Sequence, residues 1–188
     1  MKNIKSIFVL TLVSLFFISC SNDDDVNPVP VNEEEVITTL IATLNATNGT
    51  PITMEFRDLD GDGPDAPVIT VSSALLANTT YNGSLNLLNE TTDPAESIRE
   101  EIEEEANDHQ FFFSNSSDLV TFAYGDEDGN GNPIGLLFSL TTTTVGNDTM
   151  TITLRHEPNK EAEGVSGGDI TNAGGETDIA VTFPFTIE

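Results

Sequence analysis

The chain has 188 residues, of which 32 are acidic and only six are basic, so its formal net charge is −26. A chain this acidic repels phosphate backbones, which excludes nucleic acid as a partner and favours cations. Cys20 is the only cysteine, which excludes an intramolecular disulfide and leaves the core and any bound ion to stabilise the fold.

The first 20 residues are typical of a bacterial lipoprotein export signal. Lys2 and Lys5 precede an apolar run of 12 residues from Ile7 to Ile18. This run is too short to span a membrane, since a spanning helix needs about 20 residues. It ends in Phe17-Ile18-Ser19-Cys20, which resembles a lipobox. We therefore expect a signal peptide at residues 1–19 and a diacylglycerol on Cys20 that anchors the protein to the membrane. The alternative is an ordinary signal peptide that contains a cysteine.

Residues 20–35 are expected to be a linker, because acidic side chains and prolines both extend a chain. The run Ser21-Asn22-Asp23-Asp24-Asp25 resembles the acidic signal that takes Bacteroidota lipoproteins to the cell surface. This favours an outer-membrane location on the cell surface over the periplasmic face, and a plain solvated tether is the alternative. Residues 36–188 are long enough for one domain with its own core. From Cys20 onwards the formal charge is −28.

The domain at 36–188 is rich in threonine, valine, isoleucine and phenylalanine in short alternating runs, which predicts strands. Period-two alternation, as in Ile134–Leu140 and Ile179–Ile187, places one set of side chains in a core and the other in water. Pro184 cannot donate a ladder hydrogen bond, so the last strand is expected either at a sheet edge or with a bulge. The run Phe111-Phe112-Phe113 favours a strand that is buried on both faces, and an exposed platform for a ligand is the alternative. We expect strands at residues 36–46, 50–58, 67–72, 79–89, 109–114, 119–125, 134–144, 148–156 and 178–187.

These elements predict an all-β fold, either a single antiparallel β-sandwich or an up-and-down, lipocalin-like barrel of about eight to nine strands. One short helix interrupts them, with Asp93 as its N-cap, Pro94 in its first turn and Glu96 completing a capping box. Its apolar stripe is Ala95, Ile98, Ile102 and Ala106. Acidic residues in the last turn oppose the helix dipole, which indicates either a nearby cation or a solvated face. Residues 158–177 form a long glycine-rich segment, and such a loop is often functional or mobile.

Two acidic turns resemble the opening of a calcium loop, with carboxylates at positions 1, 3 and 5 followed by glycine. Neither has the glutamate that an EF-hand needs at position 12, where Ile69 and Leu137 stand instead. Calcium is therefore the expected cofactor only if other oxygens complete the shell, and solvated hairpin turns are the alternative. The first turn would use Asp58, Asp60, Asp62 and Asp65, and the second Asp126, Asp128 and Asn130.

His109 and His156 are the only histidines, and each lies at the end of a predicted strand with inward parity. If the two strand ends meet, His109 and His156 form a ligand-binding site together with the adjacent Glu157. Imidazole pairs bind transition metals or haem. Met54 and Met150 share the inward parity and could add thioether ligands. The alternatives are partly buried histidines and methionines that only fill the core.

The sequence contains no metalloprotease motif, nucleophile elbow or phosphate-binding loop, so we expect no enzyme. One hypothesis is a binding module that captures a small ligand or cation at the cell surface and passes it to an outer-membrane transporter. The other is a structural or interaction protein of the envelope, with calcium-stabilised turns and no small-molecule site. A cavity lined by phenylalanine would favour the first hypothesis, and a solid core with an exposed patch would favour the second.

The stretch ITLRHEPNKEAEGVSGGDITNAGGETDIAVTFPF, together with the acidic turn after ITMEF, resembles a family of small Flavobacteria-type lipoproteins of the Bacteroidota. These carry the automatic label "type 1 periplasmic binding fold". The resemblance covers most of the chain after the signal peptide and implies the lipoprotein address. The label itself implies two α/β domains with many helices, for which this chain is too short and too rich in strands.

Overall fold

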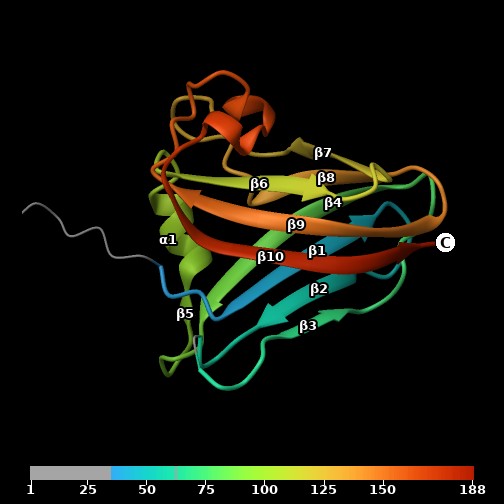
Figure 1. The fold of residues 1–188 in the computed structure, drawn as a ribbon, viewed down its shortest axis with the longest axis horizontal. Coiled ribbons are helices and arrows are strands. Elements are labelled where there is room, and N and C mark those ends of the chain that lie inside the picture. Colours follow the sequence, from blue (N-terminus) through green and yellow to red (C-terminus); the bar gives the residue numbers. More distant parts are fainter. Residues whose placement is uncertain (1–34, 62) are drawn as a thin grey trace, which may run out of the picture. The chain divides into compact units, whose positions relative to one another are not determined.

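The computed structural model describes residues 35–61 and 63–188. In this part of the chain the strands form two antiparallel sheets whose inner faces share one core (Figure 1). Cys20, the expected signal peptide and all of the expected linker before Glu35 lie outside the described residues, as does Asp62. No helix among the described residues is long and apolar enough to cross a membrane.

The larger sheet has the strand order β3-β2-β1-β4-β8-β7, with neighbours antiparallel throughout. A seventh, two-residue strand, β5, pairs with the end of β4. The bounds of these strands are β1 (Thr39–Ala46), β2 (Ile52–Arg57), β3 (Val68–Val71), β4 (Thr80–Asn89), β5 (Glu96–Ser97), β7 (Val120–Tyr124) and β8 (Leu137–Thr142).

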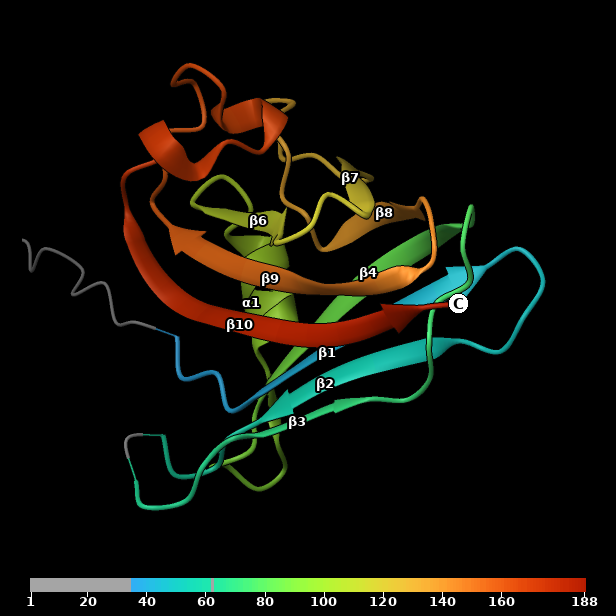
Figure 2. The same cartoon turned by 45° about the vertical axis from the view of Figure 1, so that its right-hand side comes forward.

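The smaller sheet contains β6 (His109–Asn115), β9 (Gly146–His156) and β10 (Glu176–Ile187) in the order β10-β9-β6. Figure 2 shows β9 and β10 as long curved strands that lie across the larger sheet. Among the named strands β10 pairs only with β9, so Pro184 stands on an edge strand, and the strand also carries a bulge between Thr177 and Ile179. Beyond Pro184, Ile187 forms an isolated bridge with Leu75.

The all-β prediction is confirmed, and of its two forms the sandwich is the one observed, because the sheets do not close into a barrel. A strand is present at each of the nine predicted positions. β5 was not predicted, since two residues are too few to show a period. The strands that alternate clearly in sequence place their apolar sets inside, as in β10, where every second residue from Ile179 to Ile187 is buried.

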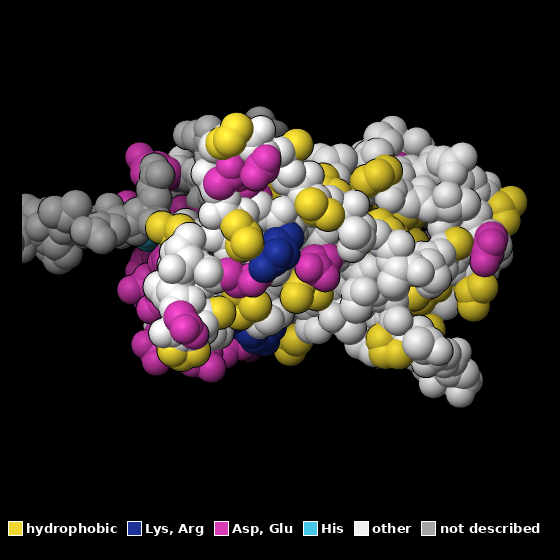
Figure 3. All heavy atoms as spheres, turned by 90° about the horizontal axis from the view of Figure 1, so that it is seen from below, with side chains coloured by type: hydrophobic (Ala, Val, Ile, Leu, Met, Phe, Trp, Pro, Cys, Tyr) yellow, Lys and Arg dark blue, Asp and Glu magenta, His cyan; other side chains and the backbone are white. Residues whose placement is uncertain are grey.

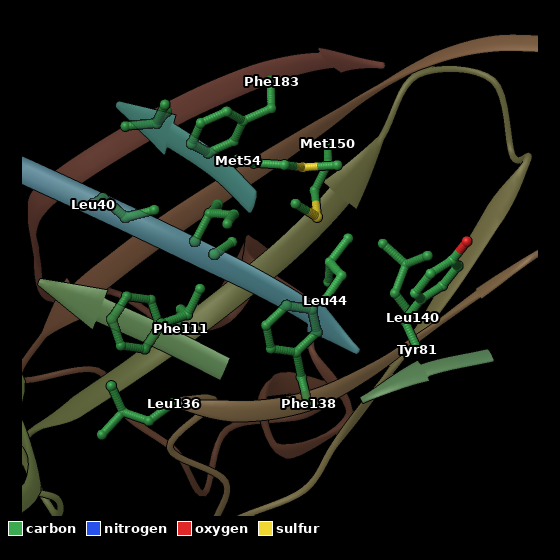
Figure 4. Packing of buried hydrophobic residues seen from close by; sticks show 14 of the residues in the cluster. Leu40, Leu44, Met54, Tyr81, Phe111, Leu136, Phe138, Leu140, Met150 and Phe183 are labelled. Carbon is green, nitrogen blue, oxygen red and sulfur yellow. The ribbon is translucent and has the colours of Figure 1, made fainter. Parts of the chain in front are cut away.

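The core between the sheets is filled by side chains from both, with Met54, Met150 and Phe183 next to one another (Figure 4). Both methionines are fully buried, and each such apolar side chain contributes about 1.5–3 kcal/mol. Gly83 makes room for the ring of Phe138, because a Cβ at Gly83 would lie 2.4 Å from the Phe138 Cζ. Side chains from both sheets therefore pack the interior that the described residues enclose.

The helix begins later than the capping signal predicts. α1 spans Ile98–Glu104 and its N-cap is Ser97, whose hydroxyl accepts from the backbone N–H of Glu100. The prediction that Asp93 caps the helix is wrong, because Glu96 and Ser97 are extended and pair with Asn89 and Leu88 as β5. The apolar stripe is confirmed for Ile98 and Ile102, which are buried, whereas Ala95 is exposed.

The glycine-rich segment covers the outer face of β6. It contains two short 3₁₀ turns, η1 (Val165–Gly167) and η2 (Ile170–Asn172). Phe112 packs there against Val165 and Ala173 in a small second cluster, while Phe111 points into the main core. Gln110 Nε2 donates to the carbonyl of Val165 at 2.9 Å. β6 is therefore buried on both faces, which confirms the interpretation of its three phenylalanines.

Candidate metal centre

His109 and His156 meet at one end of the smaller sheet. His109 begins β6, His156 ends β9, and the two are direct partners in the antiparallel register. Their rings stack, with centroids 4.5 Å apart and planes inclined by 19°. The two strand ends therefore meet, which is the condition for His109 and His156 to form one ligand-binding site. Two axial nitrogens on opposite sides of a haem iron need far more space, so this stacked pair does not fit haem.

A β-bulge in β10 adds a carboxylate to the pair. Thr177 pairs with Arg155 and Ile179 pairs with Leu154, so Asp178 is the extra residue between them. Strict alternation with Ile179 would point Asp178 outward, but an extra residue in one strand re-aims the side chains beside it. The side chain of Asp178 is fully buried beside the two histidines.

Each histidine faces one oxygen of this carboxylate. Nε2 of His109 lies 4.0 Å from Oδ2 of Asp178, and Nδ1 of His156 lies 3.9 Å from Oδ1. Both distances exceed the range of about 2.7–3.2 Å for an N–H···O hydrogen bond. The three side chains thus surround a common point without closing on one another, and they are at most 5% exposed.

The tautomer of His109 follows from its neighbours. Its Nδ1 lies 3.2 Å from the carbonyl oxygen of Glu105, which can only accept, so Nδ1 carries the proton and Nε2 carries a lone pair. Burial lowers the pKa of His109 even though the Glu105 carbonyl opposes this shift, so the ring is neutral at neutral pH. Nε2 is buried and has no hydrogen-bond partner among the described residues. An imidazole oriented by Nδ1–H···O=C is the usual state of a metal-binding histidine.

Two further carboxylates approach His109 from outside the smaller sheet. Glu105 is the C-cap of α1, and Glu35 lies just before β1. Ligand atoms of Glu35, Glu105 and His109 all lie within 4.8 Å of one another, as do those of His109, His156 and Asp178. Burial, a hydrogen bond with Glu101 and the nearby charges of other carboxylates raise the pKa of Glu35 to about 7.

The arginine and lysine side chains of the described chain are engaged elsewhere. Their partners are Glu90 for Arg57, Glu103 for Arg99, Thr177 for Arg155 and Asp128 for Lys160. Figure 3 shows acidic side chains gathered at the left-hand end of the molecule, the end at which α1 lies in Figure 1. The acidic end of the molecule is therefore the end at which a cation would be attracted most strongly.

Two imidazoles with a carboxylate form a ligand set that suits zinc and other divalent transition metals. Four ligand atoms at about 2.0–2.2 Å from a tetrahedral ion lie about 3.3–3.6 Å apart. The observed separations of 3.9 and 4.0 Å are slightly wider. Small rotations of the side chains would close this gap.

Glu157 is not part of the cluster. Its side chain is exposed, and its backbone N–H donates to the carbonyl of Asp108 at 2.6 Å. Asp178 supplies the carboxylate in its place. Met150 lies six residues before His156 on β9, which separates them by about 20 Å. Together with Met54 it fills the core and is too far away to be a ligand.

The first acidic turn uses its carboxylates as turn caps. Oδ1 of Asp58 accepts from the backbone N–H of Gly61 at 3.0 Å, and Oδ2 of Asp60 accepts from that of Asp65 at 3.1 Å. Within the described part of the chain, no group of three imidazole or carboxylate ligands contains Asp58, Asp60 or Asp65. All three are outside the core, and the contribution of Asp62 lies outside the described residues.

The second acidic turn has a cation from the chain itself. Nζ of Lys160 lies 2.9 Å from Oδ2 of Asp128, and both side chains are almost fully buried. Oδ1 of Asp128 accepts from the N–H groups of Asn130 and Asn132. Although burial raises the pKa of Asp128, Lys160 and these N–H groups together lower it. Asp126 accepts from Gly135 and Leu137, so the turn is stabilised by internal donors.

A third carboxylate, Asp148 at the start of β9, is satisfied in the same way. It is buried, and its oxygens accept from the backbone N–H groups of Ser116, Ser117, Leu119 and Thr149 at 2.7–3.1 Å. Although burial raises the pKa of Asp148, these hydrogen bonds hold it well below its usual range. This structural role could not be predicted from sequence, because hydrogen bonds from distant N–H groups leave no local pattern.

An aromatic hollow on the surface is too small to be a typical ligand site. It measures about 160 Å³ and is lined by Phe113, Phe122 and Tyr124 and by Gly167 and Gly168 of the glycine-rich segment. Small-molecule sites usually measure about 300–1,000 Å³. This hollow is therefore not the phenylalanine-lined cavity that would favour a small organic ligand.

Comparisons with protein-family models, with curated proteins and with solved structures found no match.

Proposed function

We propose that the protein is a lipid-anchored module that binds a divalent transition metal ion through His109, His156 and Asp178. The observation that carries this proposal is the buried Nε2 of His109, whose lone pair faces a carboxylate oxygen 4.0 Å away and has no hydrogen-bond partner among the described residues. This lone pair can coordinate an ion, and the carboxylate of Asp178 would supply an oxygen ligand beside it.

The anchor part of the proposal is supported by the sequence. The lipobox-like run that ends at Cys20 and the acidic residues after it favour an outer-membrane lipoprotein displayed at the cell surface. A cation captured there could be passed to an outer-membrane transporter. The high negative charge of the chain would raise the local concentration of cations around the site.

We propose binding and not catalysis, because the three side chains are at most 5% exposed. A substrate other than a small ion could not reach an ion held between them. The ligand chemistry also favours zinc-like ions over calcium, since calcium prefers shells made of oxygen atoms.

Isothermal titration of the purified protein with Zn²⁺ tests the proposal. We expect saturable binding of one ion, weakened at least about tenfold in Asp178→Asn and in His156→Gln, because loss of even an outer-shell partner costs about 10–100-fold. Glu157→Gln is the matched control, since it removes one carboxylate beside His156 from an exposed position and should bind like the wild type. Wild-type affinity in Asp178→Asn, or no binding by the wild type, would contradict the proposal.

The second candidate is a structural or interaction protein of the envelope. It is favoured by the packed core and by exposed apolar side chains on and near the edge strand β3, among them Val68 and Ile69. An open strand edge of this kind can pair with another chain. If the titration shows no metal binding, this candidate is the one that remains.

A further inference from the structure

The strand β3 is an open edge of the larger sheet. Among the described strands only β2 lies beside it, and Figures 1 and 2 show it as the outermost strand on that side of the molecule. Ser72, directly after β3, donates its N–H to the carbonyl of Thr53 at 2.9 Å. Because bonded and non-bonded pairs alternate in an antiparallel ladder, the backbone groups of Ile69 and Val71 point away from β2. An added strand could pair with them.

The edge of β3 also carries exposed apolar side chains. Val68 is 60% exposed, and Ile69 is 41% exposed although it has the parity of Val71, which packs against the core. In the loop before β3, Leu59 is 47% exposed. Proteins usually protect such an edge with charged residues or proline on the strand itself, and β3 contains neither. The sequence of β3 therefore permits pairing with another chain.

A hollow lies beside this edge, and we call it the acidic hollow. It measures about 290 Å³, and the loop between β2 and β3 forms part of its wall. Arg57 of β2 pairs with Val68 of β3 in the register, so both side chains point to the outer face of the sheet, where the hollow lies. Its apolar lining comes from Leu59, Ala66 and Val68, and its carboxylates come from Glu55, Asp58, Asp60 and Asp65.

The charge of the acidic hollow favours a cationic occupant. Arg57 is the one basic residue that lines it, and its Nε and Nη2 already donate to the two carboxylate oxygens of Glu90 at 3.0 and 2.8 Å. A second copy of this chain would bring the same carboxylates to the edge, and the net charge of −26 adds to that repulsion. A side chain with an apolar stem and a cationic tip matches both the lining and the carboxylates.

We propose that β3 and the acidic hollow form a docking site for an extended segment of a partner protein that carries a lysine or an arginine. The segment adds a strand to the larger sheet by pairing with Ile69 and Val71, and its basic side chain lies in the hollow. Main-chain hydrogen bonds supply the affinity, and the hollow supplies the preference for a basic side chain. The site shares no residue with His109, His156 and Asp178, so it can be tested separately from the proposed metal centre.

Fluorescence anisotropy with labelled synthetic hexapeptides tests this proposal. In each peptide valine and threonine alternate, and one central position carries lysine, norleucine or glutamate. We expect the lysine peptide to bind about fivefold more tightly than the norleucine peptide, which has a similar stem but no charge, because this is about the largest factor that an exposed ion pair supplies. The glutamate peptide should bind more weakly than either. No binding of the lysine peptide, or equal binding of all three, would overturn the proposal.

A double variant locates the basic side chain. Glu55→Gln/Asp65→Asn removes two carboxylates of the acidic hollow and should reduce the preference for lysine over norleucine from about fivefold to about twofold or less. Glu163→Gln/Asp118→Asn is the matched control, since it removes one glutamate and one aspartate from exposed positions outside the hollow and should keep the preference. An unchanged preference in Glu55→Gln/Asp65→Asn would overturn the proposal.

N-methylated peptides test the strand pairing. Methylation of alternate amides removes the N–H donors along one edge of an extended peptide, and the lysine peptide is methylated along each edge in turn. One of the two peptides should lose binding, because only one edge of the added strand faces β3. Bound lysine peptide should also slow hydrogen–deuterium exchange of the Ile69 and Val71 amides more than that of Thr70, whose amide faces β2. Equal binding of the two methylated peptides, or a dimer of the protein that excludes the peptide, would overturn the proposal.

Discussion

Replacing Lys160 by methionine removes the ammonium that pairs with Asp128 and keeps the length of the side chain. In the native protein Nζ donates to Oδ2 of Asp128 at 2.9 Å and to the carbonyl of Ala106 at 2.6 Å. The two side chains are 4% and 0% exposed, so the variant would leave a buried carboxylate without its counterion. Removing one partner of a buried ion pair destabilises a protein by about 3–5 kcal/mol.

We expect the lower end of that range, about 3 kcal/mol, because Asp128 would still accept from the N–H groups of Asn130 and Asn132. For a domain of this size, 1 kcal/mol shifts Tm by about 2–4 °C, so Tm should fall by about 6–12 °C. Guanidinium denaturation followed by circular dichroism measures the loss, and a thermal melt checks it.

The double variant Asp128→Asn/Lys160→Met removes both charges. It should be more stable than the sum of the two single losses predicts, because neither charge is then left unpaired. Calcium should not restore Lys160→Met, since Asp126 and Oδ1 of Asp128 already accept backbone N–H groups. A loss below about 1 kcal/mol, or strict additivity in the double variant, would refute this reasoning.

Four further predictions concern other parts of the molecule. The pKa of Asp148 is held below its unfolded value of about 3.9, so the stabilisation by this carboxylate is present above that pH and is lost as pH falls towards the folded pKa. Wild-type stability from denaturant titrations should thus fall more steeply between about pH 5 and 2.5 than that of Asp148→Asn. Gly175→Ala should destabilise the fold by more than twice the roughly 1–2 kcal/mol expected for Gly174→Ala. Both glycines have positive φ, but only a Cβ at Gly175 meets backbone, 2.1 Å from the carbonyl oxygen of His156, and chemical denaturation compares the two. Cys20→Ala should release the protein from the membrane fraction, and retention there would contradict the lipid anchor. If the first acidic turn holds calcium, excess EDTA should lower the Tm of the wild type but not that of Asp58→Asn; an unchanged wild-type melt would exclude this.

The strand pattern could be predicted because each face of a two-layer sandwich meets one environment. Alternation in β10 follows directly from a core on one side and water on the other, and it is visible from Ile179 to Ile187. The start of α1 could not be predicted in this way. The capping signal at Asp93 is local, whereas β5 exists because Glu96 and Ser97 find partners on β4, which is a non-local interaction.

The candidate site was predictable only for its histidines. Their position at two strand ends and their parity could be read along the chain, and the register of β6 and β9 brings them together. The carboxylate could not be identified, because Asp178 points inward through a bulge that breaks the alternation on which the prediction depends. Glu35 and Glu105 were also missed, since only the folded chain places them beside His109.

Three carboxylates outside the candidate site have structural roles. Asp126, Asp128 and Asp148 accept backbone N–H groups or an ammonium, and these internal donors make an added cation unnecessary. The distinguishing feature of the candidate site is His109, whose Nδ1–H points to the Glu105 carbonyl and whose buried Nε2 has no hydrogen-bond partner among the described residues. The described part of the chain therefore places electron-pair donors together at one end of the smaller sheet, while its four arginine and lysine side chains are engaged elsewhere, and that combination is the physical basis for expecting a metal ion there.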